Sequence, residues 1–205
     1  MQQKYRSYTI KVIQDTDHMN PREEWENLGI MLCSHKNYIL GDEQIKISDF
    51  NSWEDVENHL IKEGAIGLQR MYMLDHSGIT INTTGFDYPW DSGQIGFIYT
   101  TREKIQKSFT NWKYLTRDRI EFIEDLLLDE VKVYNDYLTG NVWGYEIEKA
   151  GESLDSCWGY FGDTDYMIKE AKSIIDHIIE TEIRKKYPLS FIFPEMKEHI
   201  LTQYT

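Results

Sequence analysis

Cysteine, proline and basic residues are scarce in this chain of 205 residues, which has 2 Cys, 4 Pro and 22 Lys plus Arg. Two cysteines are too few for the disulfide framework of a small secreted protein, so we expect both thiols to be reduced. The low proline count and the 14% of aromatic residues exclude a disordered composition. The chain can therefore build a folded core.

Positive charge is outnumbered by negative charge. Asp plus Glu is 35 against 22 Lys plus Arg, which gives a formal net charge of -13. A chain this acidic repels a phosphate backbone, because affinity for nucleic acid comes largely from cationic side chains that release counterions. We therefore expect no direct binding to nucleic acid.

Long apolar runs are missing as well. No stretch approaches the roughly 18 apolar residues of a membrane-spanning helix. Residues 1–17 do not contain the apolar segment of a secretory signal. These observations predict a cytoplasmic protein that does not associate with a membrane.

Short segments in which apolar and polar residues alternate predict strands. We expect strands at 5–13, 30–33, 38–40, 71–74, 79–83, 94–100, 142–148 and 154–160. The second and third should form a hairpin, and the three strands between 71 and 100 should form one antiparallel meander.

Two long segments have apolar residues every three or four positions, which is the period of an amphipathic helix. They predict helices at about 116–139 and 164–187, with Leu127 and Ile175 on the buried stripes. Shorter helices are expected at 21–28 and 53–63. The whole pattern predicts a single α+β domain over residues 1–205, with an antiparallel sheet packed against the two long helices.

Two loops carry side chains that often do chemistry. Asp75-His76-Ser77-Gly78 follows one predicted strand, and Asp91 precedes another that begins with Gln94. A catalytic or ligand site on His76, Asp91 and Gln94 is one hypothesis, because scaffolds place functional groups on loops. Turn chemistry is the other, since Asp, Ser and Gly close hairpins through local hydrogen bonds and positive φ angles.

A zinc site is a further hypothesis, because Cys33, His35, His76, Asp91 and Cys157 are of the types that ligate zinc. However, the sequence contains no C-x-x-C pair and no H-E-x-x-H motif. Buried structural cysteines are the commoner explanation. We therefore expect neither a metal nor a cofactor.

Signatures of common enzymes are missing too. The sequence has no G-x-S-x-G motif and neither of the glycine-rich phosphate loops. Cys157 lies in a segment predicted as a strand, not at a helix N-terminus, where a thiolate would be stabilised. We favour a protein that is not an enzyme.

Carboxylates are concentrated in two parts of the sequence. The candidate binding residues are Glu23, Glu24, Glu121, Glu124, Asp125 and Asp129. We expect Asp118, Glu130 and Asp136 to face outward as well. Such residues can form a solvated surface that keeps the protein soluble. Alternatively, they can imitate the phosphates of DNA and occupy the basic groove of a nucleic-acid enzyme.

Several motifs resemble those of a family of small proteins encoded by bacteriophages and mobile elements. The resemblance covers most of residues 15–162. It is carried by Asn20-Pro21-Arg22, Leu28-Gly29-Ile30-Met31, Cys33-Ser34-His35, Asp75-His76-Ser77-Gly78-Ile79, Trp90-Asp91-Ser92-Gly93-Gln94-Ile95-Gly96 and Asp155-Ser156-Cys157.

The resemblance implies an origin, but no catalytic role can be carried over from a family without an established activity. Small acidic accessory proteins of phages often antagonise host defence, as anti-CRISPR and anti-restriction proteins do. Tyr88 stands where the resemblance implies a cysteine, which weakens any zinc site in that loop.

Together, these observations predict a non-enzymatic, phage-type inhibitor that acts in the bacterial cytosol. Its partner is expected to be a host defence nuclease or complex with a basic nucleic-acid groove, bound through acidic and aromatic surface. The alternative is a small enzyme, or a ligand-binding or metal-binding protein, with its site on the loops of His76 and Asp91.

Overall fold

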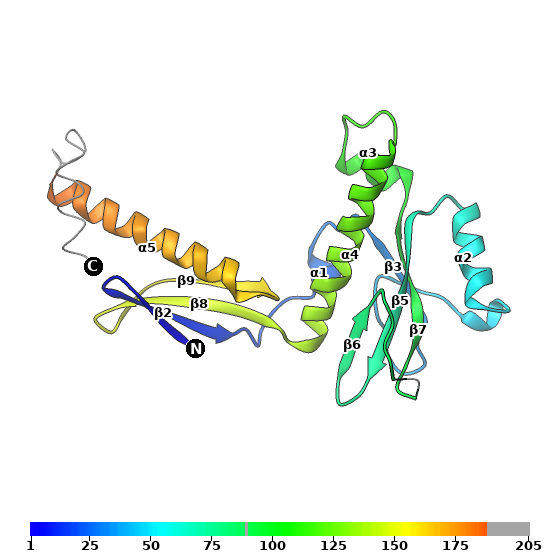
Figure 1. Cartoon of the computed structure of the whole chain (residues 1–205), viewed down its shortest axis with the longest axis horizontal. Helices are drawn as coiled ribbons and strands as arrows, with labels where there is room; N and C mark the ends of the chain where they lie inside the picture. Colours follow the sequence, from blue (N-terminus) through cyan, green and yellow to red (C-terminus); the bar gives the residue numbers. More distant parts are fainter. Residues whose placement is uncertain (89, 188–205) are drawn as a thin grey trace. The chain divides into compact units, whose positions relative to one another are not determined.

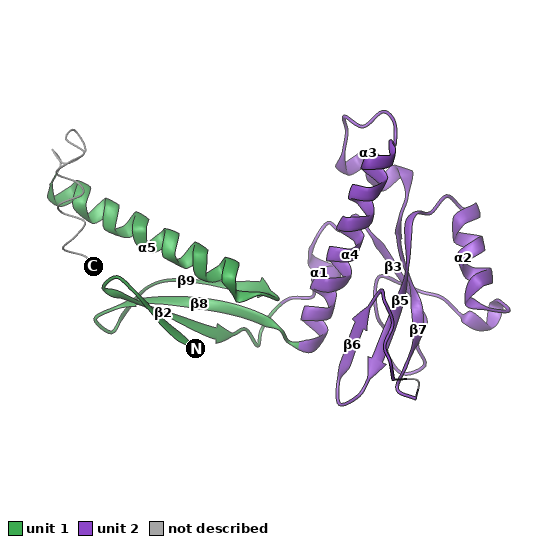
Figure 2. Ribbon diagram, in the orientation of Figure 1, with its two compact units in different colours: residues 1–18, 140–205 green, residues 19–139 purple. Residues whose placement is uncertain are grey.

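The computed structural model describes residues 1–88 and 90–187, and its chain divides into two compact units. Unit 2 is residues 19–139, and unit 1 combines residues 1–18 with the chain from Gly140 onward (Figure 2). Each unit has a sheet and a long helix of its own. The sequence predicts that both units unfold as one cooperative domain, and calorimetry can test this prediction against independent unfolding of the two units.

Unit 1 is a four-stranded antiparallel sheet with one helix on it (Figure 1). The strand order is β1-β2-β8-β9. Apolar residues of β2 and β8, among them Ile10 and Ile147, are buried against Ile175 and Ile179 of α5. The elements are β1 (Gln2–Tyr5), β2 (Tyr8–Gln14), β8 (Val142–Lys149), β9 (Glu152–Phe161) and α5 (Thr164–Lys186).

Unit 2 is inserted in the sequence between two neighbouring strands of unit 1. Gln14 in β2 lies opposite Trp143 in β8, and the backbone N–H of Asp15 donates to the carbonyl of Val142 over 2.8 Å. The chain therefore leaves the sheet of unit 1 and returns to it at adjacent positions.

Unit 2 has a five-stranded sheet in the order β4-β3-β7-β5-β6. Its strands are β3 (Ile30–Cys33), β4 (Glu43–Gln44), β5 (Ile66–Asp75), β6 (Ile79–Asn82) and β7 (Ser92–Thr100). Its helices are α1 (Pro21–Glu24), the 3-10 turn η1 (Ile47–Asp49), α2 (Trp53–Lys62), α3 (Arg102–Ser108) and α4 (Arg117–Thr139). Only the β3–β4 pair is parallel among these strands.

The sheet of unit 2 lies between two helical layers, with α4 on one face and α2 on the other (Figure 1). Alternation along β3 explains both cores, because Met31 is buried with Leu127 of α4 and Leu32 is buried with Val56 of α2. Gly96 allows the close approach of β3 to β7. A Cβ atom there would lie only 2.0 Å from the Leu32 carbonyl oxygen.

The α+β class is confirmed, and the two long helices lie where the apolar period predicts them. The expectation of one sheet under both helices is wrong. The two stripes pack in separate clusters: Leu127 of α4 is buried with residues of unit 2, and Ile175 of α5 with residues of unit 1. Periodicity identifies the buried face of a helix but not the sheet that it covers.

Two predicted strand arrangements are wrong. The single strand at 5–13 is a hairpin, because the chain turns at Arg6, whose φ is 53°. The meander between 71 and 100 is different as well, since β5 lies between β6 and β7 and pairs with both. Alternation of apolar and polar residues predicts that a segment is a strand, but it does not predict which other strand it pairs with.

Two predicted boundaries also differ from the structure. The segment 38–40 is not a strand, so it forms no hairpin with β3. The helix expected at 21–28 ends at Glu24, because the backbone of Trp25 is extended with φ -107° and ψ 149°.

Candidate functional site

The short helix α1 begins as its sequence predicts and brings Arg22 into the protein. The side chain of Asn20 accepts a hydrogen bond from the backbone N–H of Arg22 over 3.0 Å, and Pro21 occupies the first helical turn. The Arg22 side chain is only 2% exposed. A cation that is this deeply buried requires partners of opposite charge.

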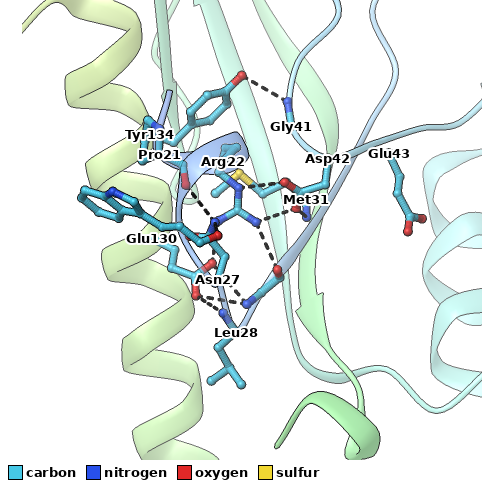
Figure 3. Close-up of polar contacts among 12 residues, drawn as sticks. Pro21, Arg22, Asn27, Leu28, Met31, Gly41, Asp42, Glu43, Glu130 and Tyr134 are labelled. Carbon is cyan, nitrogen blue, oxygen red and sulfur yellow. Dashed lines mark hydrogen bonds and ion pairs between the residues drawn. The ribbon is translucent and has the colours of Figure 1, made fainter. Parts of the chain in front are cut away.

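Arg22 is held by two carboxylates and a carbonyl (Figure 3). Its Nε donates to Asp42 Oδ1 over 3.0 Å, and its Nη1 donates to Glu130 Oε2 over 2.6 Å. Its Nη2 donates to the carbonyl of Gly29 over 3.0 Å. Burial lowers the pKa of Arg22, but the bonds to Asp42 and Glu130 outweigh it and leave the pKa above its ordinary value.

The two carboxylates also accept backbone hydrogen bonds. Glu130 Oε1 accepts from the N–H groups of Leu28 and Gly29 over 2.7 and 3.0 Å. Asp42 Oδ2 accepts from the N–H of Met31 over 2.7 Å. This Arg22 network therefore ties α1, β3 and the segment after β3 to α4 (Figure 3).

Two carboxylates that were expected to face outward do not. The Glu130 side chain is only 17% exposed because it belongs to the Arg22 network. Asp136 is buried, with 7% of its surface exposed. Counting the carboxylates outside the apolar stripe of α4 therefore overestimates how many of them are exposed to solvent.

A hollow of about 330 Å³ lies between α1, the segment after it, the end of α3 and α4. We call it the α1–α4 hollow. Its apolar lining includes Phe109, Leu126 and Trp25, and Trp25 is 49% exposed. Glu26 and Asp129 line the same hollow. Apolar surface and carboxylates are thus combined at one place.

Five of the six candidate binding carboxylates are exposed: Glu23, Glu24, Glu121, Asp125 and Asp129. Glu124 is half-buried, and its Cγ packs over Gly67 in β5. Exposed pairs partly neutralise the surface, since Lys107 bonds to Glu26 over 3.2 Å and Arg117 bonds to Glu121 over 2.9 Å. Asp125 and Asp129 have no such cationic partner among the described residues.

The two loops singled out in the sequence come together. His76 Nδ1 lies 3.1 Å from Asp91 Oδ2, and the backbone N–H of Asp75 donates to the carbonyl of Asp91 over 2.9 Å. A second hollow of about 380 Å³ opens beside them and is lined by His35, Met73, Asp75, Trp90, Asp91, Ser92, Gly93, Gln94 and Ile95. We call it the loop hollow. His35, Asp91 and Gln94 therefore share one site, with His76 attached through Asp91.

Tyr38 connects this site to the loop after β3. Its hydroxyl donates to Asp75 Oδ2 over 3.1 Å, and its ring stacks on that of His35 at 4.9 Å. The hydrogen bond to Asp75 and the charge of that carboxylate raise the pKa of Tyr38. Tyr38 therefore supports two residues that line the loop hollow, His35 by stacking and Asp75 by a hydrogen bond.

The cysteines lie elsewhere. Cys33 is buried in the core of unit 2, where burial, together with the charge of Asp42, raises its pKa to about 12. Cys157 is half-buried in β9 of unit 1, and both thiols are free. In the part of the chain that the structure describes, no three His, Cys, Asp or Glu side chains are grouped to hold a metal ion.

The His76–Asp91 pair can orient an imidazole, but it does not form a nucleophilic triad. The hydroxyl of Ser92 donates to the carbonyl of Tyr88 over 2.6 Å. Among the described residues, no hydroxyl or thiol forms a hydrogen bond with the His76 ring. A triad would need a nucleophile at that distance.

Sequence reasoning missed the residues that build the α1–α4 hollow. The sequence carried one indication for Arg22. A cation in the first turn of a helix interacts unfavourably with the helix dipole, so its presence there suggests a compensating interaction with other residues. Trp25 was a second indication, as an aromatic residue within the acidic stretch of residues 23–26. Phe109 and Leu126 gave no signal that distinguishes them from core residues.

Comparisons with protein families, with curated proteins and with solved structures found no match to this chain. Across the two described ranges, no helix is long and apolar enough to cross a membrane. A function must therefore be inferred from the two hollows and from the charged residues around them.

Proposed function

We propose that this protein is a non-enzymatic inhibitor that binds a host defence nuclease or complex through its α1–α4 surface. This surface comprises the α1–α4 hollow and the exposed carboxylates Glu23, Glu24, Asp125 and Asp129. The observation that carries the proposal is that two acidic segments, far apart in the sequence, flank one apolar hollow. The partner presents a basic nucleic-acid groove to this surface.

The combination of charge and apolar area suits a protein partner. Carboxylates around a binding site accelerate association with a basic surface, and buried aromatic residues supply much of the affinity. Trp25 is 49% exposed and Phe122 of α4 is 47% exposed. Such residues are enriched in interfaces, whereas a surface that only maintains solubility needs no exposed tryptophan.

The surface is also pre-organised. The Arg22 network holds α1 against α4, so the carboxylates on the two helices keep their spacing before a partner binds. A rigid surface loses less conformational entropy on binding than a flexible acidic tail. This rigidity supports a partner with charges at regular positions, such as the phosphate-binding residues of a nuclease.

The experiment isolates partners from host lysate at increasing salt and then measures the association rate of the captured protein. We expect the rate to fall as salt screens charges over about 8 Å at physiological ionic strength. The variant Asp125→Lys with Asp129→Lys should associate about tenfold more slowly. DNA should compete with the inhibitor for the partner.

The matched control reverses two charges on the other face of the sheet, in Glu54→Lys with Glu63→Lys. Both are exposed, at the two ends of α2. This control should bind normally. Equal loss in both variants, a captured protein that does not bind DNA, or no captured protein would each contradict the proposal.

A further inference from the structure

Three chain segments form the loop hollow at one end of the sheet of unit 2. β3 ends at Cys33, β5 ends at Asp75 and β7 begins at Ser92. Backbone hydrogen bonds hold the segments together, since the N–H of Ser34 donates to the carbonyl of Ile95 over 2.7 Å and that of Asp75 donates to Asp91 over 2.9 Å. The hollow is therefore built on paired backbone and not on a free loop.

The charges around the loop hollow are negative. Its ionisable lining residues are Asp75, Asp91 and His35, and the described lining includes no Lys or Arg. The partners of the two carboxylates are the Tyr38 hydroxyl and the His76 ring. Both contacts use the Oδ2 atoms, so among the described residues each Oδ1 atom is left to accept a hydrogen bond from a ligand.

The other lining groups favour a flat cation with several donors. Gln94 Nε2 donates to the carbonyl of Gly96, which leaves its Oε1 as an acceptor. Trp90 is 95% exposed and lines the hollow, so its ring can cover a planar cation. A guanidinium has five donors in one plane and stacks on aromatic rings, whereas an ammonium is compact and strongly hydrated.

We propose that the loop hollow binds a guanidinium group, through Asp75, Asp91 and Gln94 and against the ring of Trp90. The group belongs either to an arginine side chain of a protein or to a small guanidinium compound. This site uses none of the residues of the α1–α4 surface, so it does not depend on the function proposed above.

Gly93 provides a way to fill the hollow. It lines the hollow, and a Cβ atom built on it meets no heavy atom of the described residues within 4 Å. A side chain at this position can therefore enter the hollow without displacing the protein. Gly93→Leu should keep the fold and block the ligand.

The experiment titrates the full chain with N-acetyl-arginine amide and follows two-dimensional NMR shifts of the backbone amides of residues 75–78 and 90–95. The matched probes are the lysine amide and the citrulline amide, which is nearly the shape of arginine but uncharged. We expect the arginine probe to bind at least about tenfold more tightly than the citrulline probe, because uncharged citrulline cannot form charge-assisted hydrogen bonds with the two carboxylates. Lysine should be weaker than arginine.

Variants assign the binding to the loop hollow. Asp75→Asn and Asp91→Asn should each weaken the arginine probe about tenfold, and Gly93→Leu should abolish its binding. Asp87→Asn is the matched control, since Asp87 is exposed in the same loop but does not line the hollow. This control should bind normally.

Two further probes distinguish the sources of the guanidinium. Tighter binding of a Gly-Arg-Gly peptide than of methylguanidine indicates an arginine side chain of a protein, and the reverse order indicates a small compound. Equal binding of the citrulline and arginine probes overturns the proposal. So does full binding by Asp91→Asn or Gly93→Leu with an unchanged fold, or the lack of saturable binding by any guanidinium probe.

Discussion

Arg22 and Glu130 are 108 positions apart in the sequence, yet Arg22 Nη1 lies 2.6 Å from Glu130 Oε2. This pair joins the first helix of unit 2 to its last. The same carboxylate accepts two backbone N–H groups just after α1. The wall of the α1–α4 hollow therefore depends on one buried ion pair.

Removing this cation should be costly. Arg22→Ala leaves Asp42 and Glu130 without their shared partner, and we expect a loss of about 3 to 5 kcal/mol in the free energy of unfolding. Arg22→Lys keeps the charge but cannot form the forked contacts, so its loss should be smaller but measurable. Urea denaturation measures both.

Arg70 is the control for this prediction. It pairs with Glu57, but its side chain is 47% exposed. Arg70→Ala should lower the free energy of unfolding by less than about 1 kcal/mol. Similar losses for Arg22→Ala and Arg70→Ala would mean that the Arg22 network contributes no more than a surface ion pair.

The cores of the two units can be tested separately. Leu127 and Ile175 are fully buried, in unit 2 and unit 1 respectively. Leu127→Ala and Ile175→Ala should each cost about 2 to 5 kcal/mol. Leu128, beside Leu127 on α4, is 37% exposed, and Leu128→Ala should cost less, about 1 kcal/mol.

Calorimetry of these variants also tests the number of cooperative units. Because the cores are separate, we expect Leu127→Ala to lower the transition of unit 2 and Ile175→Ala that of unit 1. A single transition that both variants lower equally would instead support the one domain predicted from the sequence.

Unit 1 should fold without unit 2. Residues 19–139 lie between the paired ends of β2 and β8, where Gln14 faces Trp143. Replacing this insertion with a short Asn-Gly turn should give a folded β2–β8 hairpin under α5. Dispersed amide signals in NMR and a cooperative thermal transition are the expected results. A chain with the spectrum of a random coil would contradict the prediction.

Cys33 should make the protein less stable at alkaline pH. Its folded pKa is raised to about 12. The unfolded thiol titrates near pH 8.5, so only the unfolded state gains charge between these values and stability falls as pH rises. The slope contributed by Cys33 should approach about 1.4 kcal/mol per pH unit. Urea denaturation from pH 7 to 10 should show a shallower decline for Cys33→Ala.

The sequence predicts the long helices well because their signals are local. Apolar spacing places Leu127 and Ile175 on the buried stripes, and Asn20-Pro21 marks the start of α1. The hairpin at Arg6 could not be predicted, because a positive φ is uncommon for arginine and the alternation continues through the turn. Pairings such as β5 with β7 depend on the whole sheet.

The candidate sites also differ in how far the sequence could predict them. Asp75, His76 and Asp91 could be placed together because they flank successive strands of one region. The network of Arg22 with Asp42 and Glu130 could not, since no local pattern relates residues so distant in the sequence. The expectation that Glu130 faces outward is wrong for the same reason, because its carboxylate pairs with buried Arg22 and is mostly shielded from solvent.

The insertion of unit 2 imposes an order on synthesis. β2 leaves the ribosome before unit 2, and its partner strand β8 follows only after residues 19–139. At about 5 to 20 residues per second, this interval lasts on the order of ten seconds. Throughout that time the edge of β2 that will pair with β8 is open to other strands, while the whole of unit 2 is being made. The nascent chain is thus most prone to mispairing before β8 and β9 emerge.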